Sequence, residues 1–229
     1  MASVSIIIPT YNEAERIGPL IGYLRKHAPT ATIWIADSPN TIDQTTQIAT
    51  DLGVRVLPCP VAGRAAQMNY AAKHATGDLL YFVHADVFPA PHFYTAITEA
   101  VAEGHQLGYF CMAFDSPSRL LQFNSFCTRR DTLFSGGGDQ TLFIQRSTFE
   151  QLEGFREDIP LMEDFDLVRR AKKANLNPQL LSGPTLVSAR KYEQNSWLKV
   201  NAINLVTILL FYCNAPQQWL VHLQRQLQN

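Results

Sequence analysis

The sequence predicts an α/β protein with a mostly parallel, Rossmann-like sheet flanked by helices and followed by a C-terminal helical tail. Over the first hundred residues, short apolar runs alternate with helical stretches, and such alternation produces right-handed crossovers and a parallel sheet. The chain has 229 residues, of which 46% are hydrophobic, so it can bury a full core without disulfides or structural metal. From Trp197 onward the pattern is helical throughout, interrupted at Pro216.

Four apolar runs in the first half have the composition of strands buried on both faces. Each is rich in Ile, Val and Leu and is bounded by polar or turn residues. We predict strands at Val4–Pro9, Thr32–Asp37, Val54–Cys59 and Leu79–Val83.

Helical patterns separate these runs. The first helix has an apolar face, and we expect Asn12 to be its N-cap, with Glu15 as the capping-box partner. The apolar face consists of Ala14, Ile17, Leu20, Ile21 and Leu24, and the later helices of this half are predicted at Thr45–Leu52, Ala65–His74 and Pro91–Glu103.

The second half is less regular. It predicts strands at Tyr109–Phe114, Thr141–Gln145 and Leu186–Arg190, and helices at Ser118–Arg130 and Glu163–Ala174. We therefore expect one main domain over residues 1–195 and a helical extension over residues 196–229. The extension is expected to pack on the domain, on a second subunit in a homodimer, or on a membrane surface.

Charge and cysteine usage limit the function classes. With 19 basic and 20 acidic residues the net charge is −1, so no basic field exists to hold nucleic acid. The four cysteines show no C-x-x-C spacing and are typical of reduced thiols in a cytosolic protein.

The apolar segment Ala202–Cys213 is too short to span a bilayer, which takes ~20 residues. We expect a cytoplasmic protein whose tail packs on protein, because few Lys or Arg residues flank it. The alternative is peripheral docking at the inner face of the cell membrane, helped by the aromatic residues of the tail.

Polar side chains follow each of the four predicted strands. Ligands of an open parallel sheet bind beyond the carboxyl ends of its strands, so these residues are the candidates for a site. Helix caps and turns favour similar residues, which explains Asn12 and Ser38 better than it explains Asp86. The candidates are Thr10, Tyr11, Asn12 and Glu13, then Asp37 and Ser38, then Gly63, Arg64, Gln67 and Asn69, then His84, Ala85 and Asp86.

With these motifs in order, the sequence resembles a family 2 glycosyltransferase of the GT-A fold. The finer resemblance is to the bacterial radical-SAM/selenodomain-associated glycosyltransferases. Two features depart from the general pattern: His84 replaces the first acid of the usual Asp-x-Asp metal motif, and Ser38–Asp43 replaces a glycine-serine-rich turn. The matching segments are Pro9–Glu13, Asp37, Gly63–Asn69, His84–Asp86, Gly137–Gln140, Ile159–Asp164 and Ser188–Tyr192.

The resemblance implies an inverting transfer of a sugar from a nucleotide-diphosphate sugar to an acceptor hydroxyl. It implies that Asp164 is the general base and that Glu163 supports it. A divalent cation, Mn²⁺ or Mg²⁺, would neutralise the leaving diphosphate, with Asp86 as a ligand. His84 would either bind the metal or orient Asp86.

Other residues are expected to contact the substrates. Arg64 would bind the phosphates with its planar cation, although an ion pair at the helix start is the alternative. The glycines of the 136–138 segment would let the backbone approach a sugar closely, or would form a mobile connector. The donor-binding set is Thr10, Tyr11, Glu13, Asp37, Arg64, Gln67, Asn69, Ala85, Asp86, Arg190 and Lys191, and the acceptor or sugar set is Gly137, Gly138, Asp139 and Gln140.

Three other functions remain to be weighed against sugar transfer. A catalytically silent sugar-nucleotide-binding or scaffold protein would retain the same fold without turnover. A nucleotidyltransferase should have a Gly-rich loop after its first strand, whereas Pro9–Glu13 contains no glycine. A dehydrogenase is disfavoured because no G-x-G-x-x-G follows a strand.

Overall fold

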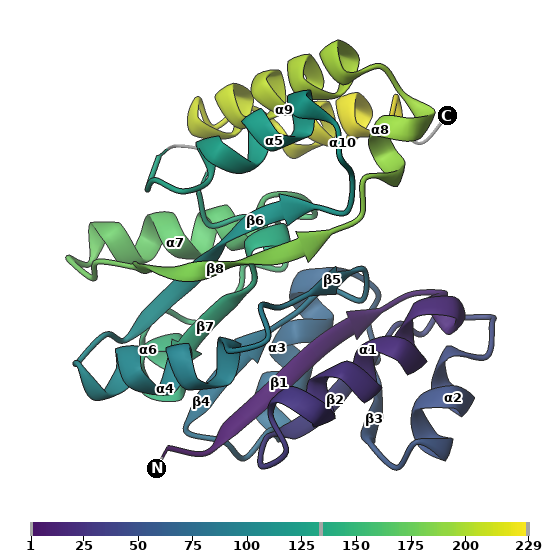
Figure 1. The fold of residues 1–229 in the computed structure, drawn as a ribbon, viewed down its shortest axis with the longest axis vertical. Coiled ribbons are helices and arrows are strands. Elements are labelled where there is room, and N and C mark those ends of the chain that lie inside the picture. Colours follow the sequence, from purple (N-terminus) through teal and green to yellow (C-terminus); the bar gives the residue numbers. More distant parts are fainter. Residues whose placement is uncertain (1, 133–134, 228–229) are drawn as a thin grey trace.

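A computed structural model describes residues 2–132 and 135–227. Within these residues an eight-stranded sheet runs in the order β3-β2-β1-β4-β7-β6-β8-β5, with helices on both faces (Figure 1). The strands are β1 (Val4–Thr10), β2 (Thr32–Asp37), β3 (Arg55–Pro58), β4 (Leu79–Phe82), β5 (Val87–Phe88), β6 (Leu107–Phe114), β7 (Leu142–Gln145) and β8 (Gln179–Val187). The longer helices are α1 (Ala14–His27), α2 (Thr45–Asp51), α3 (Arg64–His74), α4 (Phe93–Ala102), α5 (Arg119–Cys127), α7 (Glu163–Lys173), α9 (Trp197–Tyr212) and α10 (Gln217–Arg225).

The N-terminal half forms the predicted parallel sheet. β1 pairs in parallel with β2 and β4, and β2 pairs in parallel with β3. Successive side chains of a strand point to opposite faces. Ile6 and Ile8 accordingly enter the core cluster beneath α1, α2 and α4, while Ile7 enters the cluster beneath α3, α6 (Arg146–Gln151) and α7. This is why the strands are apolar along their whole length, and the α/β fold class is confirmed.

The predicted capping box of the first helix is wrong. Asn12 has a left-handed φ of 54°, and its Oδ1 accepts a hydrogen bond from the Ile42 amide instead. The backbone amides of Glu13 and Ala14 donate to Oγ1 of Thr45, the first residue of α2, and to Oδ2 of Asp43 in the loop before it. The start of α1 is thus satisfied by a segment about 30 residues away, which local sequence does not show.

In the second half the strands mix directions. β7 lies antiparallel to β4 and β6, while β8 lies parallel to β6 and antiparallel to β5. The strand predicted at Leu186–Arg190 is misplaced, because β8 ends at Val187 and α8 begins at Arg190 (Arg190–Gln194). The Ala189 amide donates to Asp115 Oδ1, which turns the chain away from the sheet. The two-residue β5 and the six-residue α6 are too short to show a periodic pattern.

The helices α5, α8, α9 and α10 form a layer at one end of the molecule, beyond β6 and β8 (Figure 1). Ser196 caps α9 by accepting a hydrogen bond from the Lys199 amide. α9 also packs against α7, since the centroid of the Phe211 ring lies 6.5 Å from that of the Phe165 ring on α7. Among the described residues, no helix is both long and apolar enough to cross a bilayer.

Candidate active site

A pocket of about 320 Å³ opens at the carboxyl edge of β1, β2 and β4, where the sequence predicts the site. Most of its lining comes from the ends of β1 and β4, from the start of α3 and from the short helix η1 (Gly138–Gln140). The lining residues are Pro9, Thr10, Tyr11, Glu13, Arg64, Gln67, His84, Ala85, Asp86 and Asp139.

One wall of the pocket is held by a buried hydrogen-bond network. Asp37 accepts hydrogen bonds from the hydroxyls of Thr10 (2.7 Å), Thr41 (2.8 Å) and Thr46 (2.5 Å). The Gln67 amide donates to the backbone oxygens of Thr10 and Ala36, joining the ends of β1 and β2. In this structure Asp37 and Gln67 therefore shape the wall, and Asp37 itself does not line the pocket.

Several side chains that line the pocket are more exposed to solvent than Asp37 and Gln67. Tyr11 is exposed, and Asp86 is partly exposed. Glu13 forms an ion pair of 2.6 Å with Arg16, one turn along α1. These groups are available to an incoming ligand without breaking the core.

Arg64 spans the pocket toward α7. Its Nε lies 2.9 Å from Glu163 Oε1, and its side chain remains 43% exposed. The predicted ion pair at the helix start is therefore present, and its partner comes from a segment about 100 residues later. The guanidinium still presents donors to the pocket that it lines.

His84, Glu163 and Asp164 converge beside this ion pair. One potential ligand atom from each of the three side chains lies within 4.8 Å of the other two. Glu163 is 1% exposed and Asp164 is 5% exposed. Neither carboxylate oxygen of Glu163 makes a hydrogen bond within the described residues, although Oε1 has the ion pair with Arg64. Buried carboxylates with few hydrogen-bond partners, together with an imidazole, are suitable ligands for a divalent cation.

The titration of this cluster is strongly perturbed. Burial, reinforced by the neighbouring charge of Glu163, raises the pKa of Asp164 well above its usual value. Burial also raises the pKa of Glu163, against the opposing effect of Arg64. Burial and the Arg64 charge lower the pKa of His84 to about 4, so its imidazole is neutral at physiological pH and can act as a ligand.

The glycine segment is packed tightly against this cluster. A Cβ on Gly138 would overlap the His84 ring and lie 2.9 Å from Asp164 Oδ2. A Cβ on Gly137 would lie 2.7 Å from the Phe165 ring. These glycines permit the close approach of His84 and of α7, and the predicted approach of a sugar to this segment stays a prediction.

Several predicted residues lie outside the pocket lining. Asn69 is buried and donates to Phe155 O and Glu157 Oε1. Gln140 donates to Phe110 O and accepts from the Gly136 amide. Arg190 is exposed on α8, and Lys191 Nζ lies 3.4 Å from Asn204 Oδ1.

Sequence reasoning missed two features. Pro9 lines the pocket, and the approach of Glu163 and Asp164 to His84 depends on how α7 packs beside β4. The sequence identified His84 and the pair Glu163 and Asp164 as separate candidates, but nothing in their spacing along the chain indicates that they meet.

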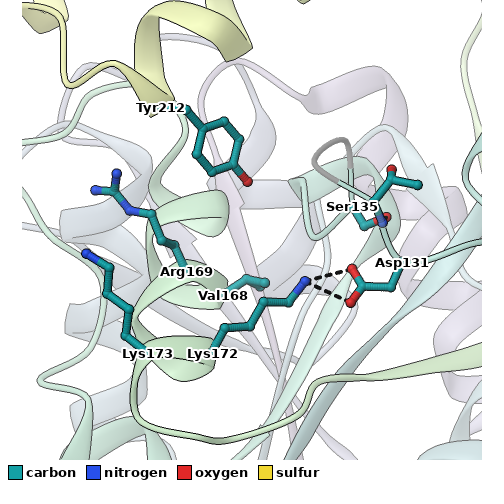
Figure 2. A pocket seen from close by; sticks show the side chains of 8 residues that line it. Asp131, Ser135, Val168, Arg169, Lys172, Lys173 and Tyr212 are labelled. Carbon is teal, nitrogen blue, oxygen red and sulfur yellow. Dashed lines mark hydrogen bonds and ion pairs between the residues drawn. The ribbon is translucent and has the colours of Figure 1, made fainter.

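A second pocket, of about 510 Å³, lies beside the C-terminal half of α7. Figure 2 shows Arg169, Lys172 and Lys173 projecting from α7 and Tyr212 facing them from α9. Lys172 is paired with Asp131, and Arg169 with Asp166. This second pocket is larger than the first, but it has no comparable acidic cluster among its lining residues and does not lie at the strand ends.

The sequence profile of glycosyl transferase family 2 matches residues 5–146. This span covers more than half of the chain and contains all ten residues that line the first pocket. The chain belongs to glycosyltransferase family 2. This glycosyltransferase is also similar to the protein RfbJ of Shigella flexneri, with 31% identity over 84 residues. The match covers 37% of the chain and 64% of RfbJ, which is less than two thirds of that protein.

Solved structures share the fold of this glycosyltransferase. The mannosyltransferase PcManGT from Pyrobaculum calidifontis, in complex with GDP-Man and Mn²⁺, has a TM-score of 0.65 at 18% identity, over 99% of this chain and 70% of that chain. Glucosyl-3-phosphoglycerate synthase from Mycobacterium tuberculosis, in complex with Mn²⁺, UDP-Glc and phosphoglyceric acid, has a TM-score of 0.66 at 18% identity, over 94% and 81%. At these identities the likeness establishes the GT-A fold.

Proposed function

We propose that the protein transfers a sugar from a nucleotide-diphosphate sugar to an acceptor hydroxyl, with inversion at the anomeric carbon. The observation that carries this proposal is the pocket at the strand ends, where Arg64 and Asp86 lie beside the cluster of His84, Glu163 and Asp164. Both fold relatives described above were solved with Mn²⁺ and a nucleotide sugar. We further propose the radical-SAM/selenodomain-associated subgroup, on the motifs quoted from the sequence, and a cytoplasmic location.

In this reaction Asp164 takes the proton of the acceptor hydroxyl. The hydroxyl oxygen attacks the anomeric carbon as the bond from that carbon to the diphosphate oxygen breaks, and the nucleoside diphosphate leaves. A raised pKa makes Asp164 a stronger base than an ordinary carboxylate once it is ionised. Arg64 stabilises the leaving phosphates, and Glu163 holds Arg64 in place.

A divalent cation fits the donor set of the pocket. We propose that His84 and Asp86 hold it, since both line the pocket, and that it supplies positive charge to the leaving diphosphate. The convergence of His84 with Glu163 and Asp164 offers a second set of ligands for the same ion. If Asp164 bound the ion, it could not also serve as the base, so the two assignments are experimentally separable.

The test combines binding with turnover. A thermal-shift panel of UDP- and GDP-sugars with Mn²⁺ should raise the melting temperature for at least one donor, because a ligand that binds the native state stabilises it. Asp164→Asn should keep Mn²⁺-dependent donor binding yet lower donor hydrolysis and transfer by about a hundredfold or more. Asp86→Asn should weaken Mn²⁺ binding itself, measured by titration calorimetry.

For each expected result there is an outcome that would contradict the proposal. Donor binding without any hydrolysis in the wild-type protein would favour the catalytically silent protein. Loss of Mn²⁺ binding in Asp164→Asn, with binding unchanged in Asp86→Asn, would assign the metal site to His84, Glu163 and Asp164 instead. A product with retained anomeric configuration by NMR would exclude Asp164 as the base of a single displacement.

A further inference from the structure

One face of α9 carries exposed apolar side chains along the whole helix. Leu198, Leu205 and Leu209 are 73%, 45% and 52% exposed, and they follow helical spacing. The opposite face holds the buried Val200 and Ile203. We define the α9 stripe as Leu198, Ala202, Leu205, Val206, Leu209 and Cys213, all exposed. A helix that is apolar on both faces needs a partner on its outer side as well.

The charge of the helical layer is one-sided. The segments 116–130, which contain α5, and 190–229, which contain α8, α9 and α10, hold seven of the 19 Lys and Arg residues and one of the 20 Asp and Glu residues. The one acidic residue is Glu193 of α8. The basic residues of these segments are Arg119, Arg129, Arg130, Arg190, Lys191, Lys199 and Arg225.

The tertiary structure brings these two segments together. Asn124 of α5 donates a hydrogen bond of 3.1 Å to Asn201 of α9. On α5, Leu120, Phe123 and Phe126 are exposed, at 51%, 59% and 57%. Few basic residues flank the tail in sequence, but Arg119 is the first residue of α5, and Arg129 and Arg130 follow shortly after its last residue, Cys127.

We propose that this helical layer docks on an anionic membrane surface, with the α9 stripe inserted at the headgroup boundary. An apolar helix face supplemented by basic residues is the combination that binds such surfaces. Trp219 of α10 is 55% exposed and has the amphipathic ring that suits this boundary. A second copy of the chain fits less well, because a two-fold contact through this layer would set seven basic residues of each copy against one acidic residue, Glu193, of the other.

The test measures binding of the full chain to vesicles by flotation. Vesicles of phosphatidylcholine with about 30% phosphatidylglycerol should bind the protein, and neutral phosphatidylcholine vesicles should bind it at least about tenfold less. The stripe variant Leu205→Gln/Leu209→Gln should lose at least about tenfold in binding, because each substitution replaces an apolar isobutyl side chain at the boundary by one that ends in a polar amide. The charge variant Arg119→Gln/Arg225→Gln should bind less, with a weaker dependence on salt.

The matched control is Ile42→Gln/Val61→Gln. Both residues are exposed, at 90% and 55%, in loops of the N-terminal half. The control should bind vesicles within about twofold of the wild type, and all variants should retain the wild-type circular dichroism spectrum, since they change surface residues.

Two outcomes would overturn the proposal. The first is wild-type protein that ignores anionic vesicles, or a stripe variant that binds as well as the control. The second is a wild-type dimer in sedimentation velocity that the stripe variant converts to a monomer, which would assign the stripe to a second copy. Vesicle binding needs no sugar transfer, so its failure leaves the donor-binding test of the proposed reaction unaffected.

Discussion

Asp164 combines burial with a like charge next to it. Its pKa is raised for both reasons, whereas Arg64 only partly opposes the shift. An acid whose folded-state pKa exceeds its unfolded value favours the folded state most when it is protonated. That stabilisation is present at low pH and is lost as the pH rises through the folded-state pKa. Ionisation of Asp164 therefore lowers the stability of the folded state.

We accordingly expect Asp164→Asn to stabilise the protein while it removes activity. In the presence of EDTA, the free energy of unfolding should rise by about 1–2 kcal/mol at about pH 8, or about 2–8 °C in Tm. The gain should be smaller at about pH 5, where more of the wild-type carboxyl is neutral. Thermal denaturation of both proteins at the two pH values measures this difference. A gain independent of pH would contradict the assigned cause.

Arg146 joins two elements that the sequence leaves unconnected. It stands at the start of α6, directly after β7, and its guanidinium donates to the backbone oxygens of Ala72, Ala75 and Gly77 at 2.8–2.9 Å. Two of these oxygens belong to the C-terminal end of α3 and its cap, where carbonyls lack helical partners and a cation is favourable. The opposite end of α3 carries Arg64, so this anchor also helps to fix the pocket wall.

Arg146→Met should therefore destabilise the protein by about 2–4 kcal/mol, since it retains the alkyl chain but leaves the three carbonyls without this donor. The matched control is Arg156→Met, because Arg156 forms an exposed ion pair with Asp158 and should cost less than about 1 kcal/mol. Urea denaturation compares the two variants. Equal losses would mean that the three hydrogen bonds contribute nothing beyond a surface pair.

The helical layer packs against the rest of the molecule through α9. Phe211 of α9 contacts the Phe165 ring and lies under the Arg169 guanidinium at 4.7 Å. Arg169 also donates to Asn214, just after α9. Both Phe165 and Arg169 belong to α7, the helix that presents Glu163 and Asp164 to the pocket. The layer thus supports the element that carries the proposed base.

A chain ending at residue 195 should consequently be less stable than the full chain. Loss of the Phe211 contacts exposes the outer side of α7, and we expect Tm to fall by about 5 °C or more. Differential scanning calorimetry of the two chains tests this. An unchanged Tm together with unchanged donor affinity would show that residues 196–229 form an independent appendage.

The α/β fold class, the four parallel strands of the first half and the edge that carries the pocket followed from residue patterns alone. Buried strands are apolar along their length, and parallel strands present their carboxyl ends at one edge, so periodicity and order along the chain suffice. The strand-end pattern also supplied His84 as a candidate, the motif resemblance added Asp164 and Glu163, and family 2 membership is confirmed.

Contacts between distant segments required the folded chain. The amides at the start of α1 are satisfied by Asp43 and Thr45, Arg64 is paired with Glu163, and Arg119 shares a layer with α9. Each of these depends on how helices pack across the sheet, and side-chain type at one position does not encode which remote group it will meet. The same packing removes Asp164 from water, and that burial, rather than its place in a motif, sets its pKa.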